Sequence, residues 1–425
     1  MHPSGPSATR RPAAVAVVLA LLVAACGSST VPTPPPTAAP SPTIVASLAP
    51  SSNPSLGPTT APTTPPSTPV PSPTAQASCA AQVLGEMTEA QRIGQLFSLG
   101  LASNQLGTAE LSAIRNQHVG SVWFTATTTV GSAAILAVTK AIQAQATQSA
   151  TAGVRLFIAA NQEGGQIQAL QGSGFDKFPS AVVQGGRSIA TLTADAKVWG
   201  QQLKAAGVNM DFAPVADVVP PGTDATNQPI GVLHREYGHD PATAGSHAAA
   251  FIAGMTAAGV ATTAKHFPGL GRVLSNTDFS ADVVDNVTTA NDPYLASFKD
   301  TIDAGVPFVM VALATYTRID ASNLAAFSPT VIGLLRQPLG FTGVIASDSL
   351  TAAAVASIPA GQRALDFLLA GGDLVVVRTA SVMVTMVAAV QARATSDPSF
   401  AHLVDGAALL VLEAKAAEGL LPSGC

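Results

Sequence analysis

Charged side chains are scarce in this chain of 425 residues, of which only 11% are Asp, Glu, Lys or Arg. The 20 basic residues are outnumbered by 25 acidic ones, so no surplus of positive charge supports binding to nucleic acid. The seven histidines include no His-x-x-x-His pair, which disfavours a metal-dependent hydrolase, and no cofactor is predicted. Long apolar runs are also missing, because the thirteen residues of Ala13–Ala25 are too few to span a bilayer.

The N-terminal segment is predicted to direct export. Arg10 and Arg11 precede the apolar run, which ends in small residues before Cys26. This order resembles a bacterial lipoprotein signal, and the resemblance implies that residues 1–25 are removed and that Cys26 carries a lipid. The protein would then be held at the outer face of the bacterial cell membrane. An ordinary secretory signal with an incidental cysteine is the alternative, and it also implies export.

Residues 26–78 are predicted to be a disordered linker. From Gly27 to Ser78 the chain holds 15 of its 32 prolines and no charged side chain, so no core can form there. Prolines at this density favour an extended polyproline II conformation. We therefore interpret the segment as a spacer between the membrane and a globular domain.

Only three cysteines are present in the whole chain. With Cys26 assigned to the lipid, Cys79 and Cys425 remain, at the two ends of the globular part. A disulfide is permitted outside the membrane, and the ends of a domain often lie close together. The sequence therefore predicts a Cys79–Cys425 disulfide.

Residues 79–425 alternate short apolar runs with longer amphipathic stretches. Eight runs are typical of strands: Gln95–Leu99, Gly120–Phe124, Arg155–Ala160, Val208–Ala213, Val260–Ala264, Pro307–Ala312, Gly343–Ser347 and Asp373–Val377. The helical patterns between them include Ala190–Ala206, Pro241–Ala257, Asp292–Ala304, Ser328–Leu335, Ala360–Ala370 and Val382–Ala394. Eightfold alternation of strand and helix predicts an α/β fold of the (β/α)8 TIM-type barrel class. A doubly wound open sheet is the structural alternative.

Polar residues follow several of these strands at their carboxyl ends, which is where a barrel places its chemistry. Asn161–Gly165 follows the third strand, Lys265–Gly269 follows the fifth, and Ser347–Ser349 ends the seventh. Asp217 and Arg235 lie in the long segment after the fourth strand. The pattern predicts one site at one end of the barrel.

Four of these side chains are candidates for chemistry or for ligand binding. Asp348 could be a nucleophile, a metal ligand or the N-cap of a helix near Leu350. Lys265 and His266 can donate hydrogen bonds to ligand hydroxyls, although a buried lysine paired with a carboxylate is the structural alternative. The Arg235 guanidinium can hold a carboxylate or a diol, whereas a surface ion pair would need no ligand.

Six segments in sequence order carry a family resemblance: Arg92–Phe97, Gln162–Gly165, Asn209–Val215, Arg235–Pro241, Lys265–Gly269 and Gly343–Asp348. Together they resemble glycoside hydrolase family 3, in particular its single-barrel bacterial β-N-acetylglucosaminidases. The likeness covers essentially all of residues 79–425. It implies hydrolysis of terminal β-linked N-acetylglucosamine with retention of configuration, from peptidoglycan or its fragments.

The resemblance also implies roles for individual residues. Asp348 matches the family nucleophile, which attacks the anomeric carbon and forms a glycosyl-enzyme. Asn161, Arg235, Lys265 and His266 match positions that bind the hydroxyls of the sugar.

The proton-transfer loop departs from the family pattern. The family has an Asp-Ser-His type triplet there, and here Asn276 stands at the aspartate and Asp278 at the histidine. A carboxylic acid can transfer the proton if burial or the charge of Asp348 raises its pKa. Asp278 is therefore the predicted acid/base.

Three further positions differ from residues that the family usually carries: Asn161 replaces aspartate, Gln166 arginine and Leu313 histidine. Such changes around one pocket leave two alternatives open. The first is another β-glycosidase of the same family. The second is a glycan-binding lipoprotein with impaired catalysis.

Overall fold

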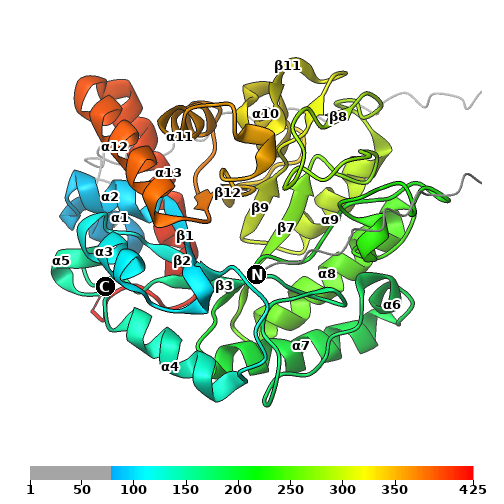
Figure 1. Ribbon diagram of the computed structural model, residues 1–425, viewed down its shortest axis with the longest axis horizontal. Coiled ribbons are helices and arrows are strands. Elements are labelled where there is room, and N and C mark those ends of the chain that lie inside the picture. Colours follow the sequence, from blue (N-terminus) through cyan, green and yellow to red (C-terminus); the bar gives the residue numbers. More distant parts are fainter. Residues whose placement is uncertain (1–77, 425) are drawn as a thin grey trace, which may run out of the picture. The chain divides into compact units, whose positions relative to one another are not determined.

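Eight parallel strands form the centre of residues 78–424, the part of the chain that the computed structural model describes (Figure 1). The strands are β1 (Phe97–Leu101), β2 (Ser121–Phe124), β3 (Phe157–Ala160), β6 (Met210–Asp211), β7 (Ala261–Phe267), β9 (Phe308–Val311), β12 (Val344–Ser347) and β13 (Val375–Val377). Every residue in them is buried, as expected for strands that are covered on both faces. All eight overlap the strands that the sequence predicts.

The strand order decides between the two predicted topologies. It runs β12-β9-β7-β6-β3-β2-β1-β13, so neighbours in the sequence are neighbours in the sheet. The ends of this sheet approach each other, because Ala346 forms a parallel bridge with Leu374 and the Leu374 amide donates to the Ile345 carbonyl at 3.0 Å. The predicted (β/α)8 barrel is confirmed, and the order never reverses as it would in a doubly wound sheet.

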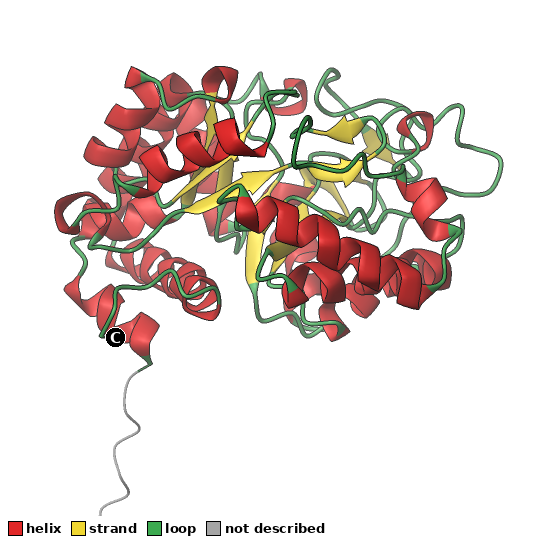
Figure 2. Cartoon of the chain, turned by 90° about the horizontal axis from the view of Figure 1, so that it is seen from below, coloured by secondary structure: helices red, strands yellow, loops and turns green. Residues whose placement is uncertain are grey.

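Helices lie around these strands (Figure 2). They are α1 (Cys79–Glu86), α2 (Glu89–Gln95), α3 (Thr108–Asn116), α4 (Ser132–Gln143), α5 (Gln148–Thr151), α6 (Ala181–Gly185), α7 (Ile189–Ala205), α8 (Pro241–Ala257), α9 (Ala296–Asp303), α10 (Pro329–Arg336), α11 (Ala360–Leu369), α12 (Ala380–Ser396) and α13 (Pro398–Ala417). Short strands occur in the loops: β4 (Gln162–Gly164), β5 (Ile167–Gln168), β8 (Val284–Asp285), β10 (Thr315–Tyr316) and β11 (Asp320–Leu324). The six predicted helices are confirmed, although a short 3-10 turn replaces the start of the one that contains α9.

The start of α8 shows how local sequence sets a helix boundary. The Asp240 side chain accepts a hydrogen bond from the Thr243 amide at 2.8 Å, and Pro241 occupies the first helical position. Proline fits there because the amide that it lacks would have no partner within the helix. This helix begins and ends at its predicted residues.

The inside of the barrel is packed with side chains from alternate strand positions. Phe157 and Phe308 meet edge to face there, with ring centroids 5.3 Å apart. The strand residues of this inner cluster are Trp123, Phe157, Ala159, Met210, Ala261, Phe308, Met310, Val344, Ala346 and Val376. Because the interior is filled, a ligand site has to lie at one end of the barrel.

The final helix, α13, packs against the amino end of the barrel. Its Lys415 ammonium is fully buried and donates to the Gly120 carbonyl at 2.8 Å and to the Gln95 side-chain oxygen at 2.6 Å. The predicted start of the first strand is wrong by two residues. Gln95 was expected to begin the first strand, but it ends α2, and β1 starts at Phe97.

Several predictions concern parts of the chain outside the described residues. The signal segment, the lipidated Cys26, the linker up to residue 77 and Cys425 all belong to those parts, so the Cys79–Cys425 disulfide stays a prediction. Within residues 78–424, no helix combines the length and the apolarity needed to cross a membrane.

Candidate active site

A cavity of about 430 Å³ lies at the carboxyl ends of the barrel strands. All six predicted catalytic and substrate-binding residues line it: Asn161, Arg235, Lys265, His266, Asp278 and Asp348. Two of the three positions that depart from the family pattern, Asn161 and Gln166, belong to the same wall. Leu313 is fully buried in the hydrophobic core and does not contribute to the wall.

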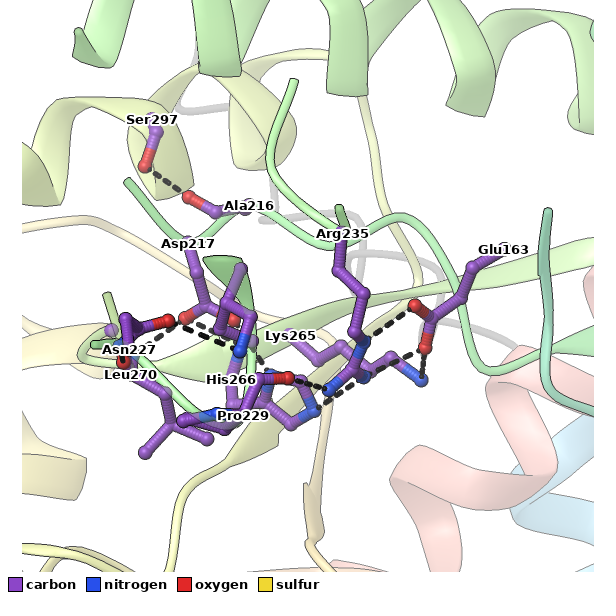
Figure 3. A network of polar contacts seen from close by, with 12 residues as sticks. Glu163, Ala216, Asp217, Asn227, Pro229, Arg235, Lys265, His266, Leu270 and Ser297 are labelled. Atoms are coloured by element: carbon purple, nitrogen blue, oxygen red, sulfur yellow. Dashed lines mark hydrogen bonds and ion pairs between the residues drawn. The ribbon is translucent and has the colours of Figure 1, made fainter. Parts of the chain in front are cut away.

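Glu163 joins two of the cationic side chains of the cavity, Arg235 and Lys265 (Figure 3). Both of its carboxylate oxygens accept from the Arg235 guanidinium at 2.8 Å, and one of them lies 2.6 Å from the Lys265 ammonium. The Glu163 side chain is only 3% exposed, and that of Arg235 is 12% exposed. The interpretation of Arg235 as a surface ion pair is therefore wrong, because its charge is paired inside the protein.

The two cations hold Glu163 in its ionised form. Burial alone would raise the pKa of Glu163, but Arg235 and Lys265 outweigh it and lower the pKa to about 2. The pKa of Arg235 is raised, since the neighbouring Glu163 carboxylate outweighs the effect of its burial. Lys265 thus fits the predicted structural alternative, a buried lysine paired with a carboxylate. It also lines the cavity, where its ammonium donates to the side-chain oxygen Oδ1 of Asn161 at 2.8 Å.

A tight turn explains how Glu163 reaches this cluster. Glu163 lies in β4, which pairs with β5 in a hairpin. Gly164 has a φ of +100°, and a Cβ atom there would lie 2.2 Å from the Pro179 carbonyl oxygen. Glycine is required at that position, because any side chain would clash with the backbone that passes over the turn.

His266 is oriented by a second buried carboxylate. Its Nδ1 atom lies 2.7 Å from Asp217 Oδ2, and its Nε2 atom lies 3.3 Å from an Arg235 nitrogen. The arginine N–H can only donate, so Nε2 acts as the acceptor and the ring proton sits on Nδ1, facing Asp217. Asp217 Oδ1 also accepts the Leu270 amide at 2.8 Å, which ties the ring to the loop that follows β7.

Asp348 directly follows β12 and lies half-buried in the cavity wall. Its amide donates to the Val311 carbonyl at 2.9 Å, and its side chain accepts the Ser349 amide at 2.7 Å. No helix begins near Leu350, because the next helical turn starts at Ala353. The interpretation of Asp348 as a helix N-cap is therefore wrong.

Asp278 lies at the mouth of the cavity and is exposed on its outer side. Loss of hydration in the cavity wall and the negative charge of Asp348 both raise its pKa, although Arg235, His266 and Arg378 act in the opposite direction. The carboxyl group is thus favoured in its protonated form by the neighbouring carboxylate. This is the electrostatic relation that the sequence analysis expected for a proton donor.

Two asparagines hold the loop that carries Asp278. Asn276 Oδ1 accepts the Asp278 amide at 2.9 Å and so builds the turn. The Asn227 amide group, which is 2% exposed, donates to the Leu270 and Val273 carbonyls at 2.8 Å each. The loop is therefore fastened to the segment that follows β6.

Sequence reasoning missed three side chains of the site. The segment that contains Glu163 was noted, but no role was assigned to the residue. Arg235 and Lys265 together require a nearby carboxylate if they are buried, and this requirement is a signal that points to Glu163. Arg378 follows β13 and lines the cavity, and its guanidinium lies 5.7 Å from the ring centroid of Trp123, which also lines it. The position of Arg378 directly after the eighth predicted strand is the signal that could have found it.

The residues between 78 and 424 offer no grouping of three or more His, Cys, Asp and Glu side chains that could hold a metal ion. Asp217 Oδ2 and His266 Nδ1 are hydrogen-bonded to each other, and the Glu163 carboxylate is paired with Arg235 and Lys265. These atoms are therefore already engaged within the protein.

Comparison with known proteins identifies the family. The model of the glycosyl hydrolase family 3 N-terminal domain matches residues 88–405, which include every side chain of the cavity described above. The chain belongs to glycosyl hydrolase family 3. The predicted resemblance is thereby confirmed at the level of the family.

Relatives in family 3 include a β-hexosaminidase of Vibrio cholerae, 32% identical over 284 residues that make up 66% of this chain and 81% of the relative. A solved structure of a β-N-acetylhexosaminidase from Beutenbergia cavernae is 47% identical, with a TM-score of 0.77, and covers 78% of this chain and 99% of that one. A family 3 β-N-acetylglucosaminidase from a Paenibacillus species is 26% identical, with a TM-score of 0.70, and covers 80% of this chain and 65% of that one.

Proposed function

We propose that this protein is a retaining glycosidase that removes terminal β-linked N-acetylglucosamine, with Asp348 as nucleophile and Asp278 as acid/base. One observation carries the assignment of roles: the two carboxyl groups line one cavity, and the charge of Asp348 raises the pKa of Asp278. A nucleophile has to be ionised while the acid is protonated, and the raised pKa of Asp278 favours the acid role for that residue. The choice of sugar rests on the names of the family 3 relatives.

The reaction takes two displacements. Asp348 attacks the anomeric carbon while the bond to the leaving oxygen breaks, and Asp278 gives its proton to that oxygen. The Asp278 carboxylate then takes a proton from water, whose oxygen attacks the same carbon and releases Asp348. Lys265 and Arg235 donate hydrogen bonds to the sugar, and His266 offers Nε2 as an acceptor. Because their partners inside the protein hold them, they need not reorganise during the reaction.

Hydrolysis of an aryl β-N-acetylglucosaminide by the full chain, beside Asp348→Asn, tests the nucleophile. We expect turnover in the parent and a loss of more than about 10⁴-fold in the variant, since the covalent intermediate cannot form. Normal turnover of the variant would refute the assignment. No turnover by the parent, with N-acetylglucosamine still raising its Tm, would instead favour the glycan-binding alternative.

The acid/base role has a separate test in Asp278→Asn. The rate should fall by about 10²–10⁴-fold for a poor leaving group and much less for an activated aryl group, which departs without a proton. The parent should lose activity as pH rises through the pKa of Asp278, because the acid form is consumed, and the variant should lack this limb. Azide should restore turnover of the activated substrate. An unchanged dependence on the leaving group would contradict the role.

The natural substrate is proposed to be peptidoglycan or its fragments, and the place of action the outer face of the bacterial cell membrane. The lipoprotein-like signal ending at Cys26 and the proline-rich spacer support this location. Cys26→Ser should release the protein from the membrane fraction of expressing cells, and retention there would contradict lipidation. Digestion of purified wall fragments should liberate free N-acetylglucosamine, measured by mass spectrometry.

A further inference from the structure

Phe279 is an apolar side chain left open to water in an otherwise well-packed domain. It is 82% exposed, and among the large exposed hydrophobic side chains of residues 78–424 it is the only aromatic one. An aromatic ring in water forgoes a large hydrophobic gain, so an exposed phenylalanine is a candidate for contact with a ligand.

The location of Phe279 indicates the kind of ligand. It follows Asp278 directly and lines the same cavity at its mouth. The donors Asn161, Lys265 and Arg235 lie together deeper in the wall, where half-buried or buried side chains prevail. The part of a substrate that meets Phe279 is therefore the part that extends out of the cavity, beyond the bond that Asp278 protonates.

The exposure of the ring does not come from a loosely held backbone. The Phe279 amide donates to the Asn276 carbonyl at 3.1 Å, and the Thr277 side chain between them is 2% exposed. The Ala353 and Ala354 amides donate to the carbonyls of Asp278 and Thr277 at 3.3 Å and 3.1 Å. These bonds hold the segment in place while the ring stays uncovered.

We propose that the Phe279 ring is the platform on which the leaving-group sugar packs. A pyranose ring presents an apolar face of C–H groups, and covering an aromatic ring with such a face removes apolar surface from water. The platform lies beside the proton donor, so it aligns the leaving oxygen with Asp278 during the first displacement. This inference rests on the proposed function and adds to it a residue that selects for a sugar leaving group.

The test compares two substrates that share the terminal sugar and differ in the leaving group. The leaving group of N,N′-diacetylchitobiose is a sugar, N-acetylglucosamine. The leaving group of N-acetylglucosaminyl fluoride is a fluoride ion, which is too small to contact the platform. For Phe279→Ala in the full chain, kcat/KM for chitobiose should fall about tenfold, as expected for roughly 50 Å² of apolar contact. The fluoride should be hydrolysed at the parental rate. Phe279→Tyr should restore most of the chitobiose activity.

Leu274→Ala is the matched control, because Leu274 belongs to the same loop and is 68% exposed but does not line the cavity. It should leave both substrates unaffected. An equal effect of Phe279→Ala on both substrates, or none on either, would overturn the platform.

The platform can be judged even if the proposed function fails. If the parent hydrolyses neither substrate, the hydrolase assignment is refuted, and binding of chitobiose and of N-acetylglucosamine is measured instead. Tighter binding of chitobiose in the parent, lost in Phe279→Ala, would support the platform. The same affinity ratio in both proteins would overturn it.

Discussion

The two ends of the barrel bury charge in opposite ways. At the carboxyl end, Arg235 and Lys265 share the Glu163 carboxylate, and they lower its pKa to about 2. At the amino end, Lys415 is equally buried, but its contacts are the neutral oxygens of Gln95 and Gly120. Burial lowers the pKa of Lys415 to about 7, so its ammonium is close to losing its proton at neutral pH.

The cations at the carboxyl end line the cavity and share a carboxylate, whereas Lys415 at the amino end joins α13 to the barrel through neutral oxygens. A buried ion pair costs free energy to desolvate, and the partner recovers much of that cost. At the catalytic end, the ion pairs with Glu163 hold the donors in a fixed orientation in front of a substrate. The amino end carries no substrate, and there burial lowers the pKa of the lysine instead.

Removing the shared carboxylate should produce the largest effect. Glu163→Gln leaves two buried cations facing a neutral amide, so we expect about 3–5 kcal/mol less stability in urea unfolding and a large loss of turnover. Because the pKa of Glu163 is lowered from 4.5 to about 2, its stabilising effect is present above pH 4.5 and is lost as pH falls to 2.

Asp405→Asn provides the control for that experiment. Asp405 pairs with Arg92 at 3.1 Å on the partly exposed surface, where the two side chains are 35% and 25% exposed. Its loss should cost about 1 kcal/mol or less. Equal destabilisation by the two variants would remove the distinction between the site pair and an ordinary surface pair.

Lys415→Met sharpens the contrast at the amino end. Between pH 7 and about 10.5 the unfolded chain binds a proton that the folded protein lacks at Lys415, so stability rises with pH by up to about 1.4 kcal/mol per unit. In unfolding experiments across that pH range, the free energy of unfolding of the variant should lack this increase. The lost hydrogen bonds shift that free energy by the same amount at every pH and do not change the slope. Lys299→Met, at an exposed position, should keep the parental slope. Parallel curves for Lys415→Met and the parent would show that Lys415 keeps its proton.

Asn227→Ala should have the smallest effect on turnover, because Asn227 holds the loop and does not line the cavity. It leaves the Leu270 and Val273 carbonyls without their donor and the Ile230 and Gly231 amides without their acceptor, at a cost of about 1–3 kcal/mol in stability. Misplacement of Asp278 should lower kcat roughly tenfold to a hundredfold, with little change in KM. Asn116→Ala, which removes an exposed hydrogen bond to Ser112, is the control. A rise in KM at constant kcat would place Asn227 in sugar binding instead.

Much of the fold and part of the site could be predicted from local patterns. The eight strands and the start of α8 follow from apolar periodicity and from a capping residue, which depend on neighbours in the chain. The contact between Gln95 and Lys415 was missed, because the two residues lie 320 positions apart in the sequence. Contacts at such separations leave no local pattern. Helix α13 was also missed, although Asp397 caps it and Pro398 begins it.

The amino-acid sequence by itself determined the barrel, the end at which its polar residues gather, and six of the residues that line the cavity. Only the tertiary structure decided how those residues are paired: that Glu163 neutralises two cations, that Asp217 orients His266, and that Phe279 stays uncovered beside Asp278. The reason is physical. Periodicity reports which face of an element is buried, whereas charge pairing and exposure depend on distances between loops that leave different strands.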